Sequence, residues 1–330
     1  MAASGGHRQD AALSPPRAAG LRIEVPLRGA GGEPVDLLRT ITSHGLASLP
    51  PLEIDEARVI LRTTLAIPGG RPRTVLVSAG RPGHALVEVV GRPPGRRGAE
   101  ALAASVRHVL HMDEDLSEFY AMALGDPELA WVARGAGRMI RSPTVLEEVV
   151  RIVCTTNCSW ALTTRMITAL VGRLGEPAPG SAEDGWGGRA FPTAQAMAAA
   201  PPRFYRDVVR AGYRGPYLRS LARSVAGGSL DLEALGRASP EELSDDEVEA
   251  RLLALPGVGP YAAAHVMLLL GRYSRLILDS WTRPTYARLL GRKRPVSDAS
   301  ILRRFRRFGR YAGLAFWCFV TRDWVDDGAA

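Results

Sequence analysis

The chain has 330 residues, which is enough for two or three domains at about 100 to 200 residues each. Hydrophobic residues make up 46% and charged residues 23%, as in ordinary globular proteins, so the composition excludes disordered and collagen-like chains. No apolar run approaches the roughly 18 residues of a membrane span, and residues 1–20 lack the apolar core of a secretory signal. We therefore expect a cytoplasmic protein that makes no contact with a membrane.

Charge and cysteine content narrow the class of partner. The 42 basic and 34 acidic side chains give a net charge of +8, which favours an anionic partner such as nucleic acid. Lys293 is the only lysine, however, and a genome-wide preference for arginine would raise the charge without any function. The three cysteines are too few for a disulfide framework or a four-thiolate metal site, so we expect neither a metal nor a cofactor.

The first third of the chain predicts strands. Residues 1–20 are rich in Gly, Ala and Pro without apolar periodicity, which predicts a disordered tail. Residues 21–112 predict a strand-rich domain that ends in a helix. A Gly- and Pro-rich loop at 91–98 precedes that amphipathic helix, which we expect at 99–113. The strand-like runs of this domain are at 57–61, 73–80 and 84–91.

The remainder, residues 113–330, predicts a helical domain. Gly and Pro interrupt it at 176–190, where we expect an exposed loop. The glycine hairpin described next is expected to be followed by two more helices. Before that hairpin, apolar periodicity predicts helices at 114–124, 127–135, 144–156, 159–174, 193–200, 203–210, 214–226, 231–237 and 245–254.

The segment 244–271 carries the most information. Ser244 and Glu247 have the spacing of a capping box, which predicts that a helix starts here. Pro260 suits the first turn of a second helix. The glycines between the helices allow a tight turn whose N–H groups point outward, so the hairpin can hold a nucleic-acid phosphate without reading bases. The expected DNA-binding residues of this turn are Pro256, Gly257, Val258 and Gly259.

The sequence LPGVG at 255–259 resembles the DNA-binding motif of the helix-hairpin-helix DNA glycosylases, and Asp279 follows Tyr261 by 18 residues (279 minus 261), close to the spacing of that family's catalytic aspartate. Residues 149–175 and 211–228 look like further helices of its 3-methyladenine and 8-oxoguanine branches, so that the similarity covers about 100–325.

The resemblance implies an α+β fold: a mostly helical helix-hairpin-helix glycosylase core with a smaller strand-rich N-terminal domain. It also implies a monomer that acts in base excision repair, at the bacterial nucleoid, on double-stranded DNA containing a damaged base.

Asp279 is the catalytic residue that the resemblance implies. An ionised carboxylate beside the sugar would stabilise the positive charge that develops as the base departs, and would position or activate water. The alternative is that Asp279 only caps the helix that follows it. The two roles are compatible.

Bifunctional members of the family use a lysine on the second hairpin helix as a nucleophile. Tyr261 occupies that position here, and the only lysine, Lys293, lies well past the aspartate. We therefore expect a monofunctional N-glycosylase without lysine-dependent strand cleavage.

The resemblance also implies a pocket for the flipped base. Tyr261 and His265 lie four residues apart on one helix face, and aromatic rings favour electron-poor alkylated bases through stacking and cation–π attraction. Alkylated purines such as 3-methyladenine are the expected substrate. Oxidised or deaminated bases (8-oxoguanine, hypoxanthine, uracil) and a non-catalytic damage-binding protein are the alternatives. The alternative is that Tyr261 is a core tyrosine and His265 a histidine whose hydrogen bonds are satisfied in the core. The further pocket candidates are Trp281, Phe316 and Trp317, and for Phe316 and Trp317 the alternative is again the core.

Two polar segments are candidates for contacting the strands around the flipped base. One comprises Asn157, Cys158 and Ser159, and the other comprises Tyr213 and Arg214. A helix cap and a turn between packed helices are the respective alternatives. The arginine run at 303–310 either contacts phosphates or forms a solvated helix face over two buried phenylalanines.

Overall fold

The computed structural model describes residues 20–181 and 185–325. The tail predicted at 1–20 thus lies, except for Gly20, outside the described residues. No helix among the described residues has the length and apolarity needed to cross a membrane.

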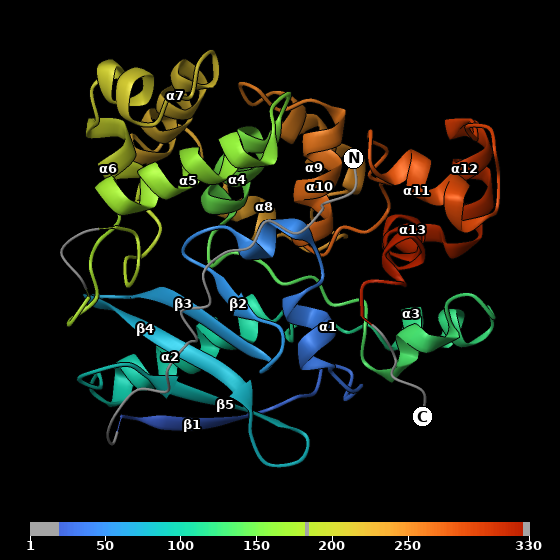
Figure 1. The fold of residues 1–330 in the computed structure, drawn as a ribbon, viewed down its shortest axis with the longest axis horizontal. Coiled ribbons are helices and arrows are strands. Elements are labelled where there is room, and N and C mark those ends of the chain that lie inside the picture. The colour runs from blue at the N-terminus through green and yellow to red at the C-terminus, as the bar shows by residue number, and fades with distance from the viewer. Residues whose placement is uncertain (1–19, 182–184, 326–330) are drawn as a thin grey trace.

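The first domain is an antiparallel sheet of five strands in the order β1-β5-β4-β3-β2 (Figure 1). Its inward side chains, such as Val75, Val77 and Val87, are buried together with Leu102 and Val106 of helix α2. The sheet and the helix therefore share one apolar core. The elements are β1 (Arg22–Pro26), α1 (Leu37–Ile41), β2 (Glu53–Asp55), β3 (Ile60–Ile67), β4 (Gly70–Ala79), β5 (His84–Val89) and α2 (Arg96–Val109).

Two sequence predictions in this domain are wrong in detail. Residues 57–59 form a turn before β3 and not the start of a strand, and Val59 adopts a φ of 54° there. Helix α2 begins at Arg96, inside the predicted loop, because Gly95 provides an extended cap. The predicted strands at 73–80 and 84–91 correspond to β4 and β5.

The rest of the described chain is helical, and Figure 1 shows these helices above and beside the sheet. The segment 176–181 and 185–190 is irregular, as predicted. The α-helices are α3 (Ser117–Leu124), α4 (Val145–Thr155), α5 (Trp160–Leu174), α6 (Ala194–Ala199), α7 (Arg214–Ala226), α8 (Glu233–Arg237), α9 (Asp245–Leu253), α10 (Pro260–Leu269), α11 (Thr282–Leu289), α12 (Asp298–Phe305) and α13 (Ala312–Thr321).

Three predictions in this half need correction. The helix expected at 127–135 is a 3₁₀ turn, Ala130–Arg134, and that expected at 203–210 is a short π-helical turn, Phe204–Val208. Within the described residues three α-helices, not two, follow α10. A kink at Gly309, whose φ is 54°, separates α12 from α13, so that one predicted helix becomes two.

The arginine run at 303–310 is largely explained by folding. Arg304 pairs with Glu128, Arg307 with Asp126, and Arg310 with Glu118. These pairs join α12 and the turn after it to the segment around α3, while Phe305 and Phe308 are buried. The burial agrees with the alternative of a helix face over two phenylalanines. Three of the five arginines of the run are neutralised within the protein, while Arg303 and Arg306 are exposed.

Buried polar contacts tie the two halves of the chain together. The guanidinium of Arg138 pairs with Glu33 and donates to the carbonyl oxygens of His111 (2.6 Å) and Glu114 (3.0 Å). Ile140 packs in the core of the sheet, although it follows the predicted domain boundary at 112–113. The boundary stays a prediction, because a residue that follows it in the chain packs in the core of the first domain.

Candidate active site

The hairpin between α9 and α10 is built by local sequence signals. Ser244 and Glu247 form the predicted capping box, with the Ser244 N–H donating to Glu247 Oε2 (2.9 Å) and the Glu247 N–H donating to Ser244 Oγ (3.3 Å). Gly257 turns the chain with a φ of 82°. A Cβ at this position would lie 2.8 Å from Tyr217 Cδ2, so glycine also permits the hairpin to pack on α7.

The hairpin presents free donors at a helix N-terminus. Gly259 is the N-cap of α10 and has no side chain to satisfy the first turn, while Pro260 lacks an N–H. Among the described residues, the N–H groups of Gly257 and Gly259 have no hydrogen-bond acceptor. Free N–H groups at the positive end of a helix dipole suit an anion such as a phosphate.

Asp279 stands at the start of α11 with one oxygen fixed and the other free. Its Oδ1 accepts the N–H groups of Trp281 (2.9 Å) and Thr282 (2.6 Å), and its own N–H donates to Thr282 Oγ1 (2.9 Å). Oδ2 has no hydrogen-bond donor among the described residues. Asp279 is thus a helix cap whose second oxygen remains available, so the structural and the chemical role do not compete.

Four of the five predicted pocket residues form one chain of ring contacts. Tyr261 meets His265 edge-on at 5.8 Å between centroids, and His265 lies 5.9 Å from Trp317. Trp317 lies 5.9 Å from Trp281. Negative charge at Asp279 contributes to raising the pKa of Tyr261, behind the larger effect of burial, which places the tyrosine within electrostatic range of the carboxylate.

Phe316 does not belong to this cluster. Its ring packs 5.3 Å from Phe305 and 6.1 Å from Tyr286, and it is fully buried. Adjacent residues on a helix point in different directions, so Trp317 faces His265 while Phe316 faces the core. These contacts favour the core alternative for Phe316, and the pocket prediction for this residue has no support in this geometry.

His265 is buried with both ring nitrogens unpaired among the described residues. Burial lowers its pKa to about 4, so the imidazole is neutral at physiological pH. A buried polar group without a partner costs roughly 1–3 kcal/mol, which folding alone does not explain. A ligand that entered this cluster would find one donor and one acceptor on His265.

The first domain also contributes to the cluster. His44 lies 6.0 Å from His265, and burial together with His265 lowers the pKa of His44 to about 3. Its Nε2 contacts the Ile140 carbonyl oxygen at 2.5 Å, which makes Nε2 the donor and leaves Nδ1 as an unpaired acceptor. The neighbouring Ser43 carbonyl oxygen accepts the Trp317 indole N–H (2.8 Å).

Sequence reasoning missed His44 and also Trp324, whose ring lies 5.4 Å from that of Trp281. Neither residue stands in a motif, and both reach the cluster only through the fold.

The structure brings the two candidate strand-contacting segments together. Asn157, with a φ of 48°, donates from Nδ2 to Tyr213 Oη (3.4 Å), and Tyr213 is 51% exposed. The Tyr213 ring lies 6.0 Å from that of Tyr217, which in turn packs on Gly257 of the hairpin. Asn157, Tyr213, Tyr217 and the hairpin thus form one surface, although no local signal in the sequence identified Tyr217.

The other candidates of these segments have internal partners. Arg214 is buried, donates to the Thr156 carbonyl oxygen, and holds its guanidinium 4.5 Å from the Tyr213 ring centroid. Cys158 Sγ donates to the Cys154 carbonyl oxygen (3.1 Å), and Ser159 caps α5. Arg214 therefore packs against Tyr213, and Arg214 and Cys158 are engaged inside the protein, whereas Ser159 is exposed and its contact with DNA stays a prediction.

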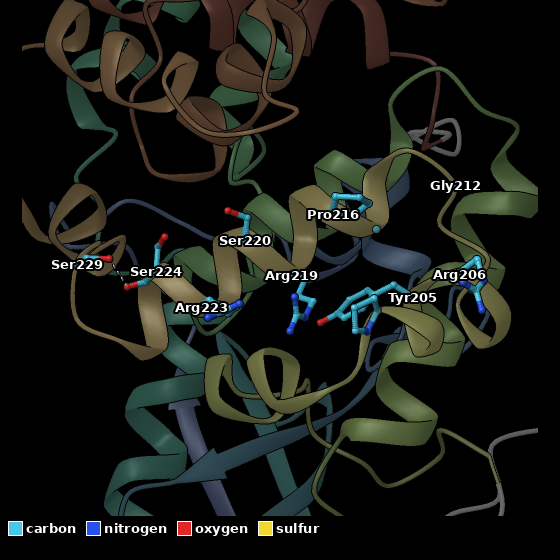
Figure 2. Close-up of a pocket in the computed structure, with 11 residues that line it drawn as sticks. Tyr205, Arg206, Gly212, Pro216, Arg219, Ser220, Arg223, Ser224 and Ser229 are labelled. Carbon is cyan, nitrogen blue, oxygen red and sulfur yellow. Dashed lines mark hydrogen bonds between the residues drawn. The ribbon is translucent and has the colours of Figure 1, made fainter.

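Two hollows lie near these surfaces. One, of about 690 Å³, is lined by Asp279 and by Lys293 among other residues. The second, of about 800 Å³, runs along α7, where Figure 2 shows Arg219 and Arg223 on one side of the helix and Ser220 on the other. The second hollow contains none of the predicted site residues.

Comparison with known proteins supports the resemblance seen in the sequence. The chain is 25% identical over 179 residues to the DNA-3-methyladenine glycosylase of Bacillus subtilis, a match that covers 54% of this chain and 56% of that enzyme. The chain thus matches little more than half the length of this curated relative. No protein-family model matches it.

Solved structures agree over most of the chain. A 3-methyladenine DNA glycosylase from Archaeoglobus fulgidus has a TM-score of 0.68 at 20% identity, and the match covers 93% of this chain and 100% of that one. An 8-oxoguanine glycosylase/lyase from Clostridium acetobutylicum, solved with DNA, has a TM-score of 0.65 at 19% identity, covering 88% and 92%.

The fold is therefore that of the helix-hairpin-helix DNA glycosylases, and the predicted resemblance is confirmed. In structure the chain is similar to members of both the 3-methyladenine and the 8-oxoguanine branches, while its reported similarity in sequence is to a 3-methyladenine enzyme.

Proposed function

We propose that this protein is a DNA N-glycosylase that hydrolyses the bond between a damaged base and its deoxyribose. One observation carries the proposal: Asp279 keeps Oδ2 free beside a buried aromatic cluster, one helix away from a hairpin with unpaired N–H groups. Such a hairpin suits a DNA phosphate, and the free carboxylate suits a cationic sugar.

In this mechanism Asp279 acts electrostatically. The N–H groups of Trp281 and Thr282 hold Oδ1, so the carboxylate is oriented before the reaction and needs no rearrangement. As the base departs, the sugar gains positive charge, and Oδ2 stabilises it and orients the attacking water. The product is an abasic site.

We propose that the reaction is hydrolysis without lysine-dependent strand cleavage. Tyr261 stands on α10 at the position where bifunctional members of the family that the sequence resembles carry their lysine. A phenol with a raised pKa is a poor nucleophile at neutral pH. Lys293 lies well past Asp279 in the sequence but lines the same hollow in the structure. The test below therefore includes a substitution of Lys293.

We propose alkylated purines, such as 3-methyladenine, as the substrate. Trp281, Trp317 and Tyr261 offer π faces, and the lowered pKa values of His265 and His44 keep the cluster uncharged at neutral pH. An uncharged aromatic cluster attracts a cationic base and does not repel it. An alkylated base also needs less specific contact, because its glycosidic bond is already weakened.

Hydrogen bonding favours a second candidate. The unpaired nitrogens of His265 and His44 suit a neutral base that is read by donors and acceptors, such as hypoxanthine or 8-oxoguanine. Oxidised or deaminated purines are therefore the alternative substrates.

The test is single-turnover excision on duplexes carrying 3-methyladenine, hypoxanthine, uracil or 8-oxoguanine, with strand breaks measured before and after alkali. Asp279→Asn retains the Oδ1 cap and should therefore fold normally, but we expect excision to fall by about 10²-fold or more. Asp36→Asn is the matched control, because Asp36 caps α1 in the same way by accepting the Arg39 N–H.

Each outcome has a distinct meaning. Excision of 3-methyladenine, with breaks only after alkali and loss in Asp279→Asn, supports the proposal, whereas preference for a neutral lesion supports the second candidate. Breaks without alkali that disappear in Lys293→Gln would overturn the hydrolytic mechanism. Tight binding without excision of any lesion would indicate a non-catalytic damage-binding protein.

A further inference from the structure

We propose that the hollow between Asp279 and the loop after α11 binds the phosphodiester backbone of the strand whose nucleotide is attacked. The inference rests on the proposed function, because it takes Asp279 as the group that meets the sugar. The hollow measures about 690 Å³, and Asp279, Arg283 and Arg288 line it together with Arg292, Lys293 and Arg294.

The first argument is an uncompensated charge. Arg292, Lys293 and Arg294 are consecutive and exposed, and no acidic side chain among the described residues pairs with any of them. Consecutive like charges repel one another, and no ion pair among the described residues offsets this repulsion. An anionic ligand removes this repulsion.

The second argument comes from a comparison with the arginine run at 303–310. Arg304, Arg307 and Arg310 each pair with an acidic side chain, so folding explains these three charges. Arg303 and Arg306 of the same run are exposed and have no acidic partner among the described residues. At residues 292–294 pairing explains none of the three charges, and all three side chains line the hollow that Asp279 also lines.

The third argument is the contrast in pairing among the cations that line the hollow. Arg283 is held by both oxygens of Asp298 (2.8 and 2.9 Å), so its charge is compensated. Arg292, Lys293 and Arg294 belong to the same lining and have no such partner among the described residues, and Pro284 and Ala287 are apolar members of it.

Geometry identifies the ligand. A nucleotide whose sugar meets Asp279 carries a phosphate on each side, and successive phosphates of one strand follow at short intervals. The strand that leaves Asp279 along the hollow therefore brings its phosphates to Arg292, Lys293 and Arg294. Helices α10, α11 and α12 follow one another across the upper right of Figure 1, so the hollow and the hairpin belong to neighbouring elements.

The test compares two triple variants of the full chain. Arg292→Gln, Lys293→Gln and Arg294→Gln remove the proposed contacts together. Arg81→Gln, Arg92→Gln and Arg97→Gln remove three exposed charges from the sheet domain as a matched control. Both variants change only exposed side chains, and thermal unfolding checks that each remains folded.

Binding to a duplex with a tetrahydrofuran abasic analogue is measured by fluorescence anisotropy between about 50 and 200 mM salt. Each lost phosphate contact lowers the slope of log affinity against log salt by about 0.9, so we expect the 292–294 variant to lose about 2 to 3 from this slope. The control should keep the slope of the wild type. At about 50 mM salt the 292–294 variant should bind at least about tenfold more weakly.

An unchanged slope in the 292–294 variant would overturn the inference, as would an equal loss in the control. Single-turnover excision by the wild type, measured beside the salt dependence, separates this result from the proposed function. If the wild type excises no lesion but the slope still falls only in the 292–294 variant, the proposal for the hollow is supported and the glycosylase proposal fails. If the wild type excises a lesion and the slope of the 292–294 variant is unchanged, only the proposal for the hollow fails.

Discussion

At the scale of single residues, His265 departs from what packing alone would produce. Its ring is buried, yet neither nitrogen has a partner among the described residues, and its neighbours are mainly rings. A residue selected for packing alone would be apolar here, because an unpaired buried imidazole destabilises the free protein. Under the proposed function, the same nitrogens would give a bound base its donor and acceptor.

His265 also predicts a dependence of stability on pH. Burial depresses its pKa from 6.5 to about 4, so the unfolded chain binds a proton in this window and the folded protein does not. Stability is therefore fully present above pH 6.5 and is lost as the pH falls towards 4. The shift corresponds to a loss of about 3 kcal/mol from this one residue.

We expect His265→Leu to be more stable than the wild type by an amount that grows from pH 7 to pH 4, and to lose excision of the preferred lesion. Urea unfolding at several pH values, with excision at neutral pH, tests both effects. His84→Leu is the control, because His84 is partly exposed on the sheet. A stability difference between His265→Leu and the wild type that stays constant from pH 7 to pH 4 would contradict the lowered pKa of His265.

The sequence made definite predictions for a residue only where the neighbouring residues along the chain carry the signal. Asp279 was predicted as a cap from its position before α11, and as a catalytic group from the resemblance of the hairpin and its spacing to a known family. Phe316 and Trp317 could not be separated, because α13 is apolar on all sides and its pattern does not indicate which face meets the pocket. His44 was missed because it reaches His265 through tertiary packing alone.

At the scale of elements, the hairpin makes a prediction that separates binding from folding. Gly259 has extended backbone angles that alanine tolerates, and a Cβ there would meet nothing within 4 Å. Gly259→Ala should therefore leave thermal stability nearly unchanged. If a DNA phosphate approaches the free N–H groups, however, the added methyl group obstructs it, and we expect binding to weaken about tenfold, or about 1.4 kcal/mol.

Gly95→Ala is the matched control for this measurement. Gly95 is likewise an extended N-cap glycine, at the start of α2, with open space around its Cβ position. Binding of both variants to the abasic-analogue duplex should differ only for Gly259→Ala. Equal affinities would show that the hairpin does not approach the DNA.

Elements were predictable where their signals are local. The capping box, Gly257 and Pro260 all lie within one short segment, so the hairpin was predicted with its ends nearly correct. The arginine run at 303–310 remained ambiguous because its partners, Glu118 to Glu128, lie far away in the chain. The pairing of charges is a property of the tertiary fold, which a linear pattern does not contain.

At the scale of the whole molecule, the candidate site depends on how the sheet domain meets the helices. Ser43 and His44 come from the first domain, while Trp317 and His265 come from the helical part. The ion pair between Glu33 and Arg138 spans the same two parts. We therefore expect this pair to affect both stability and the site.

Glu33→Leu leaves the buried Arg138 guanidinium without its counter-charge and the Leu116 N–H without its acceptor (2.7 Å). Breaking a buried pair in this way costs about 3–5 kcal/mol, which should appear as a lower urea midpoint. Adding Arg138→Met to Glu33→Leu should restore much of the loss, because the uncompensated charge is then absent. A cost below about 1 kcal/mol for Glu33→Leu alone would mean that solvent or another group satisfies Arg138, and that the contact between the sheet domain and the helices does not depend on this pair. Excision is measured on the same variants at a temperature where each is folded. If this contact aligns His44 with His265, excision should fall with Glu33→Leu and recover in the double variant.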